Sequence, residues 1–448
     1  MSRLFGTDGV RGVANEDLTP ELAFAVGRAA ASIIVAHGDR RPIVVGRDTR
    51  CSGTMLEAAI VAGITSAGRD TVSLGIVPTP AVACVTRREG AAAGVMISAS
   101  HNPVPDNGIK FFGADGFKLS DAIEDAIEAA MAAGNGPRPI GTEVGVARVA
   151  ANLGKWYYEE LYSGAADLSG LRVVVDGAYG AAYAIAPYAL RKLGADVIEL
   201  HCENDGTRIN VGCGATHLES LETAVRERIA AGERNVVGVA FDGDADRALF
   251  IDEEGLRFSG DHVMYAMATA LHDAGELTHD TIVGTVMSNI GFERALQRRG
   301  IQLERTAVGD RYVLERMISG GFVLGGEQSG HIIDLRNNTT GDGPMTAVTL
   351  LGIAARAGAR LHDLASEVTI APQLLVNVKT RSKDVLHNDA VRRAIADAET
   401  QLGESGRLLV RASGTEPLVR VMAEGTERAL VAEVAQRVAE AIQREIPD

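Results

Sequence analysis

The chain has 448 residues, of which 46% are hydrophobic and 4% aromatic, and its formal net charge is −15 at pH 7. At roughly 150 residues per domain, this length predicts about three globular domains. The acidic charge argues against a nucleic-acid-binding protein, because such a surface is normally basic.

The composition also argues against membrane insertion and export. We find no window of about 18 uncharged apolar residues, so we expect no membrane span. The stretch MSRLFGTDGVRG has no apolar segment, so we expect no signal peptide. The four cysteines have no CxxC spacing, which favours reduced thiols in a cytoplasmic protein over a disulfide framework or a zinc site (Cys51, Cys84, Cys202 and Cys213).

One pattern recurs three times along the chain: a short β-branched run, a polar loop and a helical segment. It starts at RPIVVGRDTR (41–50), at LRVVVDGAYGAA (171–182) and at DTIVGTVMSNIG (280–291). Continuous apolar strands joined by helical crossovers are typical of buried parallel sheets. We therefore expect three similar α/β domains with parallel or mixed sheets.

The C-terminal part has a different pattern. APQLLVNVKT (371–380) predicts a strand, DAVRRAIADAETQLG a helix, RLLVRASG and PLVRVMAEG a pair of strands, and RALVAEVAQRVAEAIQRE an amphipathic helix. Two helices with antiparallel strands predict a smaller α+β domain. The expected domains are 1–148, 149–250, 251–367 and 368–448.

The stretch GVMISASHNPVPDNGIKFF (94–112) contains two candidate nucleophiles, Ser98 and Ser100, followed by His101 and Lys110. A Ser–His–Asp hydrolase would need a G-x-S-x-G elbow, which this stretch does not have. Strand neighbours point to opposite faces, so we expect His101 to be badly placed to deprotonate Ser100. The same pleating would place Ser98 and Ser100 on one face.

The stretch VAFDGDADRALFIDEEG (239–255) places three aspartates at every second position: Asp242, Asp244 and Asp246. Three carboxylates this close repel one another unless a cation holds them, and oxygen ligands suit Mg²⁺ or Ca²⁺. An EF-hand is excluded because Arg247 stands where that loop needs glycine. A solvated acidic turn is the alternative. A serine near such a site favours phosphoryl chemistry.

Polar residues near glycine-rich turns predict binding of a phosphorylated polyol. Glu327, Ser329 and His331 in VLGGEQSGHII would share one face if extended. The turn in RASGTEPLVRV offers hydroxyls, backbone N–H groups and guanidinium forks to a phosphate, although the motif taken alone favours a plain hairpin turn with surface arginines. Four further arginines at strand ends or in glycine-rich loops predict an anion-binding cleft: Arg11, Arg47, Arg50 and Arg311.

These motifs occur together in one known family. In the order and spacing of GTDGVRG, ISASHNPVPDNGIKFF, DGDADR, GGEQSGH and RASGTEPLVRV, the chain resembles the α-D-phosphohexomutases along its whole length. Its length, GEQSGH and VGDRYV make it most similar to the bacterial branch that acts on glucosamine phosphates. The resemblance implies four domains around a central cleft, of which the last one swings. They would carry, in order, the phosphoserine, the metal loop, the sugar loop and the phosphate loop.

The resemblance also implies a reaction: glucosamine 6-phosphate and glucosamine 1-phosphate are interconverted through a phosphoserine and a 1,6-bisphosphate intermediate that also serves as primer. This reaction lies on the route to UDP-N-acetylglucosamine. The alternatives are a phosphoglucomutase or phosphomannomutase, a Mg²⁺-dependent sugar-phosphate phosphatase, and a non-catalytic sensor. A hexosamine phosphate is the expected small-molecule partner, and a homodimer is a family expectation.

The resemblance assigns a role to each motif residue. Ser100 matches the phosphorylated serine and supplies one ligand of a single Mg²⁺, with the three aspartates as the other ligands. The remaining matches are Lys110 and His331 for proton transfer, Arg11 and His101 for catalysis, Arg247, Arg311, Glu327 and Ser329 for substrate binding, and Arg411, Ser413, Gly414, Thr415 and Arg420 for the phosphate that does not react.

Overall fold

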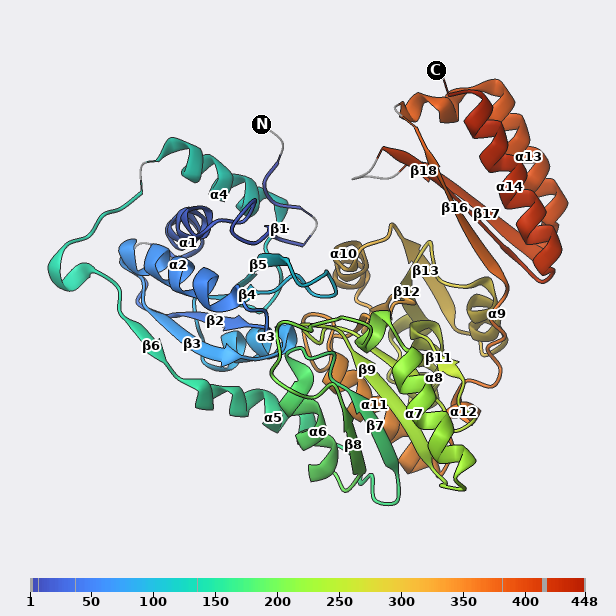
Figure 1. Ribbon diagram of the computed structural model, residues 1–448, viewed down its shortest axis with the longest axis horizontal. Coiled ribbons are helices and arrows are strands. Elements are labelled where there is room, and N and C mark those ends of the chain that lie inside the picture. The colour runs from blue at the N-terminus through green and yellow to red at the C-terminus, as the bar shows by residue number, and fades with distance from the viewer. Residues whose placement is uncertain are drawn as a thin grey trace.

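The computed structural model describes residues 3–6, 8–36, 38–134, 136–380, 382–412 and 417–446. Their strands form four sheets of six, five, four and three strands in chain order, which we call domains I to IV (Figure 1). The predicted fold class, three α/β domains and a smaller C-terminal α+β domain, is confirmed. No helix in the described ranges is long and apolar enough to cross a membrane.

Domain I has the sheet order β1-β5-β4-β2-β3-β6, in which β4, β2, β3 and β6 run parallel and β1 and β5 pair antiparallel. Inward-facing residues alternate: Val45 and Val95 pack under α1, α2 and α4, whereas Val44 and Met96 pack under α3 on the opposite face. The elements are β1 Val10–Val13, α1 Pro20–Ile34, β2 Ile43–Arg47, α2 Gly53–Ser66, β3 Thr71–Ile76, α3 Thr79–Arg88, β4 Ala93–Ile97, β5 Asp106–Gly113, α4 Asp121–Ala133 and β6 Ala147–Val149.

Domains II and III each have a mixed sheet, with orders β11-β10-β9-β7-β8 and β13-β12-β14-β15. The elements of domain II are α5 Lys155–Tyr162, β7 Arg172–Asp176, α6 Ala182–Lys192, β8 Asp196–Leu200, α7 Glu219–Ala230, β9 Val236–Phe241, β10 Ala248–Ile251 and β11 Arg257–Phe258. Those of domain III are α8 Gly260–Asp273, β12 Thr281–Thr285, α9 Ile290–Arg298, β13 Gln302–Thr306, α10 Asp310–Gly320, β14 Leu324–Gly326, β15 Ile332–Asp334, α11 Gly343–Ala357 and α12 Leu361–Leu364.

One hydrophobic core joins domains II and III. Leu350 and Leu351 of α11 belong to the same buried cluster as Val173 of β7, Val239 of β9 and Ile282 of β12. Apolar side chains buried between two sheets stabilise both, at about 25 cal/mol per Å² of apolar surface removed from water. The two domains are therefore packed as one body rather than as two separate cores.

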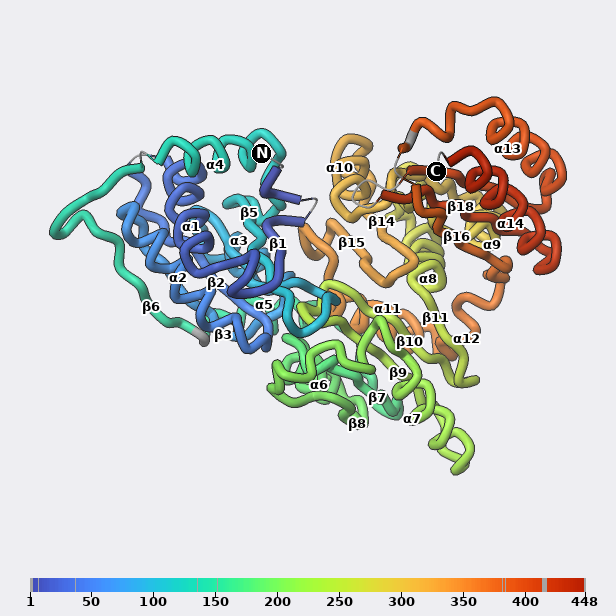
Figure 2. Tube along the Cα trace, turned by 45° about the horizontal axis from the view of Figure 1, so that its top comes forward, coloured from blue at the N-terminus to red at the C-terminus, as the bar shows by residue number. Residues whose placement is uncertain are grey.

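Domain IV lies beyond domain III, at the opposite end of the molecule from domain I (Figures 1 and 2). It has its own core, in which Val421 of β18 meets Val391 of α13 and Val434 of α14. The three strands are antiparallel in the order β16-β18-β17. Its elements are β16 Gln373–Lys379, α13 Asp389–Leu402, β17 Gly406–Ala412, β18 Leu418–Gly425 and α14 Arg428–Arg444.

Candidate active site

The loop after β4 carries both candidate serines. We expected strand pleating to place them on one face, and this is wrong because β4 ends at Ile97 and Ser100 has a left-handed backbone with a φ of 51°. Ser98 Oγ donates to Asp48 Oδ2 at 2.6 Å and accepts the backbone N–H of Ser100 at 2.9 Å. Ser100 Oγ instead donates to Asp242 Oδ2 at 2.7 Å. Ser98 thus holds the loop, and Ser100 faces the aspartates.

His101 lies closer to Ser100 than strand geometry predicted. The distance from Ser100 Oγ to His101 Nδ1 is 3.3 Å, because the left-handed turn brings the two neighbours to the same side. Burial and the charges of Arg247 and Arg11 lower the pKa of His101 to about 4. The imidazole is therefore neutral near pH 7, and the expectation that it cannot reach the serine is wrong.

Arg50 hydrogen-bonds backbone carbonyls of the loop after β4 and does not line the cavity described below. Its guanidinium is fully buried and donates to Ser100 O at 3.0 Å and to Asn102 O at 2.7 Å. It also donates to Asp48 Oδ2 at 3.0 Å. Arg47 pairs with Glu57 at 2.8 Å. The prediction that Arg47 and Arg50 line an anion cleft is therefore wrong.

The three aspartates follow β9 and come together in a buried loop. Asp242, Asp244 and Asp246 each offer a carboxylate oxygen, and these oxygens lie within 4.8 Å of one another. The relative exposures of the residues are 0%, 0% and 5%. Oδ1 of Asp244 and Oδ1 of Asp246 are buried and have no hydrogen-bond partner among the described residues. Such orphaned oxygens fit a hard divalent cation.

Lys110 supplies a positive charge to this loop. Its Nζ lies 2.9 Å from Asp244 Oδ2, 2.9 Å from Asp8 Oδ2 and 3.7 Å from Asp246 Oδ2. Burial lowers the pKa of Lys110, but the three carboxylates outweigh burial and the net pKa lies above its ordinary value. The pKa of Asp244 is lowered, because Lys110 and Thr79 outweigh the effect of burial. Lys110 is therefore a buried ammonium group.

The pKa of Asp242 is shifted in the opposite direction from that of Asp244. Burial, Asp246 and Asp244 raise its pKa well above the usual range. Arg247 is the nearest guanidinium, with Nε 3.8 Å from Asp242 Oδ2 and 3.8 Å from Asp246 Oδ1. The loop therefore carries excess negative charge that a bound cation would offset.

A cavity of about 460 Å³ lies where domains I, II and III meet. Nε of Arg11, Nε of Arg247 and both ring nitrogens of His331 are buried without a hydrogen-bond partner among the described residues. Unpaired N–H groups around one cavity suit the oxygens of a phosphate. The predicted residues that line it are Arg11, Ser100 and His101 from domain I, Asp246 and Arg247 from domain II, and Glu327 and His331 from domain III.

Three charged residues that the sequence analysis missed connect domains I and III at this cavity. Lys118 Nζ binds Asp8 Oδ1 at 2.5 Å and also binds Asp310. Asp310 Oδ2 lies 3.5 Å from His331 Nε2. Burial raises the pKa of Asp8, but Lys110, Lys118 and Arg11 outweigh it and keep the pKa low. Asp8 and Asp310 lie inside the motifs GTDGVRG and VGDRYV, which were the available signal.

The segment 327–331 is a turn between β14 and β15, so the three side chains do not share an extended face. Gly330 has a φ of 89°, which favours glycine. Glu327 Oε1 accepts the backbone N–H of Gly309 at 3.0 Å, and Ser329 Oγ donates to Glu327 Oε2 at 3.3 Å. The turn still places Glu327 and His331 on the wall of the same cavity.

Arg311 is not among the residues that line the cavity. It lies in the first turn of α10, and its guanidinium binds Asp121 at 2.7 Å and Glu315 at 3.1 Å. The sequence shows that Arg311 follows Asp310, but it does not show that the side chain of Arg311 points away from the cavity. The structure thus ties Arg311 to α4 rather than to the site.

The lining of the cavity includes no described residue of domain IV, so neither Arg411 nor Arg420 reaches it. Arg411 of β17 pairs directly across from Arg420 of β18. Burial and the charge of Arg420 lower the pKa of Arg411. Ser413, Gly414 and Thr415 lie outside the described residues.

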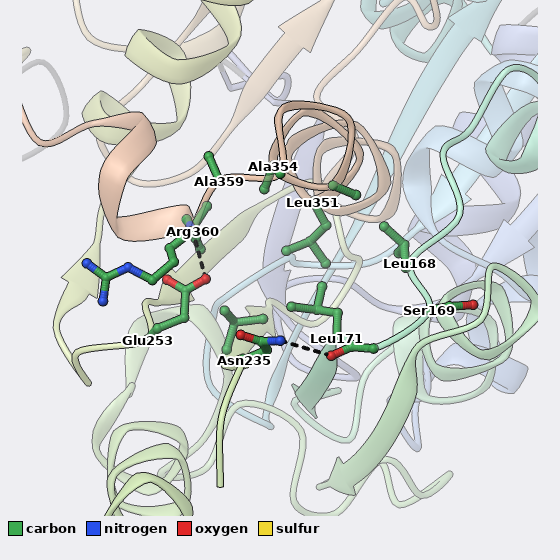
Figure 3. A pocket seen from close by; sticks show the side chains of 14 residues that line it. Leu168, Ser169, Leu171, Asn235, Glu253, Leu351, Ala354, Ala359 and Arg360 are labelled. Carbon is green, nitrogen blue, oxygen red and sulfur yellow. Dashed lines mark hydrogen bonds between the residues drawn. The ribbon is translucent and has the colours of Figure 1, made fainter.

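A second cavity, of about 290 Å³, lies between domain II and the end of α11 (Figure 3). Leu168, Leu171 and Leu351 point into it, and Glu253 at its edge accepts the backbone N–H of Leu361 at 2.8 Å. This cavity has an apolar wall and lacks the paired carboxylates and unpaired nitrogens of the first one. The chemistry of the chain therefore belongs to the cavity between domains I, II and III.

Comparison with known proteins gives matches over the whole chain. Models of the phosphoglucomutase/phosphomannomutase family match in order: α/β/α domain I at 2–137, domain II at 155–255, domain III at 259–370 and the C-terminal domain at 375–441. The phosphoglucosamine mutase of Symbiobacterium thermophilum is 53% identical over 451 residues and 100% of both chains. That of Frankia alni is 50% identical over 457 residues, 100% of this chain and 99% of the relative.

Solved structures share the fold. A phosphoglucomutase/phosphomannomutase family protein of Burkholderia thailandensis has a TM-score of 0.84 at 24% identity, over 99% of this chain and 98% of the other. N-acetylphosphoglucosamine mutase of Aspergillus fumigatus, in complex with GlcNAc-6P and magnesium, has a TM-score of 0.66 at 18% identity, over 99% and 96%. At these identities the likeness concerns the fold alone.

Proposed function

The chain belongs to the phosphoglucomutase/phosphomannomutase family, the α-D-phosphohexomutases, and on this premise we propose that it interconverts glucosamine 6-phosphate and glucosamine 1-phosphate. Full-length relatives at 53% and 50% identity carry the name of that activity. The product would serve the synthesis of UDP-N-acetylglucosamine. The enzyme is thus an isomerase that moves a phosphoryl group between two positions of one sugar.

The single observation that carries the proposal is the set of groups around one cavity. Ser100 Oγ donates to Asp242, and the same cavity is lined by Arg11 and Arg247, whose Nε groups have no hydrogen-bond partner among the described residues. Phosphoryl transfer is catalysed chiefly by positioning and by charge stabilisation. The carboxylate loop would position the serine through a bound cation, and the two guanidinium groups would stabilise the charge of the phosphoryl group.

In this proposal Ser100 carries the phosphoryl group that is transferred. The three aspartates would hold one Mg²⁺, with an oxygen of the phosphorylated Ser100 as a further ligand; the buried oxygens of Asp244 and Asp246 that have no partner among the described residues support this assignment. When bound, the ion would offset charge on the phosphate. Arg247 and Arg11 bind the phosphate oxygens, and neutral His101 hydrogen-bonds beside them.

Lys110 and His331 are the proposed proton-transfer groups. Lys110 is an ammonium 2.9 Å from Asp244, and His331 presents two unpartnered ring nitrogens to the cavity. The sugar hydroxyl that attacks the phosphoserine loses its proton to the imidazole of His331, and the leaving serine oxygen takes a proton from the ammonium group of Lys110. A 1,6-bisphosphate forms, turns round in the cavity and returns its other phosphate to Ser100.

Binding of the sugar is assigned to domains III and IV. Glu327 and Ser329 hydrogen-bond the sugar hydroxyls, which their position on the cavity wall supports. We also propose Arg311 for substrate binding; its neighbour Asp310 lines the cavity, although Arg311 itself does not. Domain IV must move toward the cavity to present its phosphate-binding residues to the end of the substrate that does not react: Arg411, Ser413, Gly414, Thr415 and Arg420.

The test is a mutase assay with glucosamine, glucose and mannose 6-phosphates, each with Mg²⁺ and added 1,6-bisphosphate. We expect the highest kcat/KM for glucosamine 6-phosphate and loss of turnover after chelation of Mg²⁺. Ser100→Ala is expected to be inactive, and Ser98→Ala is the matched control because its hydroxyl binds Asp48 instead.

Other outcomes of the same assay would contradict the proposal. A higher kcat/KM on glucose or mannose phosphate would make the chain a phosphoglucomutase or phosphomannomutase. Release of inorganic phosphate without isomerisation would indicate a phosphatase. Full activity of Ser100→Ala would exclude the phosphoserine route.

We propose four domains at 1–148, 149–250, 251–367 and 368–448, whose number and order the four sheets and the four family matches support. The boundary between domains II and III lies after β11 rather than at 250, because β10 and β11 pair within the sheet of domain II. The homodimer and the cytoplasmic location stay predictions.

A further inference from the structure

Domain II contains a second group of potential metal ligands, outside the active-site cavity. Asp176 is the last residue of β7, His201 follows the last residue of β8, and Cys213 precedes a short 3-10 turn. β7 and β8 are parallel neighbours with Asp176 opposite Leu200, so both strands end at the same edge. One ligand atom from each of the three residues lies within 4.8 Å of the other two.

The contact between His201 and Asp176 is not a hydrogen bond. His201 Nδ1 lies 3.1 Å from Asp176 Oδ1, yet this buried nitrogen has no hydrogen-bond partner among the described residues. Tetrahedral zinc with bonds of about 2.1 Å places adjacent N and O ligands about 3.4 Å apart. The observed separation of 3.1 Å is slightly shorter than this spacing, so a small outward shift of the imidazole would let both atoms bind one ion.

The carboxylate of Asp176 is held in place by backbone donors. Oδ1 accepts the N–H of Ala178 at 2.9 Å, and Oδ2 accepts the N–H of Gly214 at 2.9 Å. An ionised carboxylate has about four lone-pair sites, so both oxygens keep capacity for a further ligand. The side chain is thus oriented before any ion binds.

Cys213 completes the group with a sulfur atom. The residue is fully buried and forms no disulfide, and a backbone hydrogen bond from Asn210 orients its sulfur. Burial raises the pKa of the thiol to about 12, so the group stays protonated unless a cation displaces the proton. Sulfur, imidazole and carboxylate together suit zinc, whereas Mg²⁺ prefers oxygen ligands alone.

We propose that Asp176, His201 and Cys213 bind a zinc-like cation at a site separate from the aspartate loop. Three protein ligands leave the fourth tetrahedral position to water. The side chain of His201 is 22% exposed and gives the ion a path from solvent. The three ligands come from separate segments, which explains why a search for CxxC spacing did not find the site.

A cation here would stabilise the loops that support the active site. Asn210, three residues before Cys213, donates its backbone N–H to Ala178 O at 3.0 Å and its Nδ2–H to Ser100 O at 2.9 Å. Ala181 N–H donates to Gly243 O at 2.8 Å. The site therefore has a positioning role for the serine and aspartate loops and does not touch substrate.

The experiment measures sulfur-to-cobalt charge-transfer absorption. Full-length protein is stripped with a chelator, supplied with excess Mg²⁺ to fill oxygen-ligand sites, and titrated with Co²⁺. A Cys51→Ser background removes the exposed cysteine. We expect one Co²⁺ per chain with a thiolate band that Zn²⁺ displaces, and a rise in Tm on adding Zn²⁺.

Two variants locate the site. Cys213→Ser is expected to abolish the thiolate band, whereas Cys202→Ser is expected to keep it, because Cys202 Sγ donates to Val175 O at 3.5 Å and lies outside the group. If Cys213→Ser does not fold, His201→Gln is used, with an expected loss of Co²⁺ affinity of at least about 10-fold. No band in the background protein, a full band in Cys213→Ser, or unchanged affinity in His201→Gln would each overturn the proposal.

Discussion

Ser100 reaches its partners through its backbone conformation. A φ of 51° is strained for a residue with a Cβ, and such strain of about 1–3 kcal/mol persists only where surrounding contacts hold it. In return, the hydroxyl lies 2.7 Å from Asp242 Oδ2 and 3.3 Å from His101 Nδ1. With an extended backbone at Ser100, its hydroxyl and the His101 ring would point to opposite sides. At the scale of the residue, the left-handed turn at Ser100 decides which groups its hydroxyl contacts.

The position of the His331 ring depends on the absence of a side chain at Gly341. A Cβ at Gly341 would lie 2.4 Å from His331 Nε2, closer than real contacts allow. We expect Gly341→Ala to displace the buried ring and to lower the mutase kcat at least about 10-fold, since small misplacements of catalytic groups are costly.

Steady-state kinetics of Gly341→Ala checks this, with Gly154→Ala as control because the nearest atom there is 3.9 Å away. A wild-type kcat in folded Gly341→Ala protein would contradict the proton-transfer role of His331.

At the scale of elements, the buried side chain of Arg50 holds the loop from β4 to β5 together with Ser98 and Asn210. Arg50 donates to four carbonyl oxygens of this loop, those of Ser100, Asn102, Pro103 and Asp106. Ser100, Asn102 and Pro103 lie in the turn between the strands, and Asp106 is the first residue of β5. The loop is therefore rigid although it has no regular structure.

We expect Arg50→Lys to lower the free energy of unfolding by about 2 kcal/mol or more, because a lysine reaches fewer of these carbonyls and buried unpaired acceptors are costly. Thermal unfolding measures the change. Arg47→Lys, at the neighbouring half-buried pair with Glu57, is expected to cost under about 1 kcal/mol. Equal losses in both variants would contradict the special role of Arg50.

The start of α8 contains a buried carboxyl near the contact with domain IV. Asp261 Oδ2 accepts the N–H of Asn289 at 3.0 Å, and Asn289 Nδ2 donates to Ala371 O at 3.0 Å. Burial raises the pKa of Asp261 to about 7, with Glu424 adding to the rise and Arg305 and Arg407 opposing it. The pKa in the unfolded chain is the ordinary 3.8.

Because the folded state binds this proton more tightly, its contribution to stability is complete below about pH 4 and is lost as pH rises to about 7. We expect Asp261→Asn to lose less Tm than the wild type between about pH 5 and pH 7.5. Thermal scans across this range test it, with the exposed Asp397→Asn as control. Parallel Tm curves for Asp261→Asn and the wild type would contradict the assignment.

At the scale of the whole molecule, three domains build the cavity and the fourth lies apart from it (Figures 1 and 2). Domains II and III share a core, whereas domain IV has its own. Domain IV meets domain III through a few polar contacts, such as Arg407 to Ser288 O at 3.1 Å. Small polar interfaces favour relative domain motion.

We therefore expect glucosamine 6-phosphate to draw domain IV toward the cavity. Small-angle scattering of Ser100→Ala with substrate should show a smaller radius of gyration than without it. In the same background, Arg411→Gln with Arg420→Gln should remove the change, because the phosphate would lose both guanidinium partners. An unchanged radius with saturating substrate would contradict closure.

Local patterns predicted a large part of this protein. Apolar runs predicted the parallel strands β2, β7 and β12, because burial of a strand requires apolar residues over only a few positions. The spacing of Asp242, Asp244 and Asp246 predicted a loop that offers several carboxylates to one cation, and in the structure one oxygen of each lies within 4.8 Å of the other two. Patterns failed where a side chain could turn either way: Arg47 and Arg50 end one strand, yet neither lines the cavity.

The sequence by itself determined the strands, the domain order and the acidic loop, because periodicity and charge repulsion act between residues close in the chain. Only the tertiary structure decided that His101 contacts Ser100, that Lys118 joins Asp8 to Asp310, and that Arg11 but not Arg311 faces the cavity. These contacts depend on a left-handed turn and on where loops from three domains meet, and neither is encoded within a single segment.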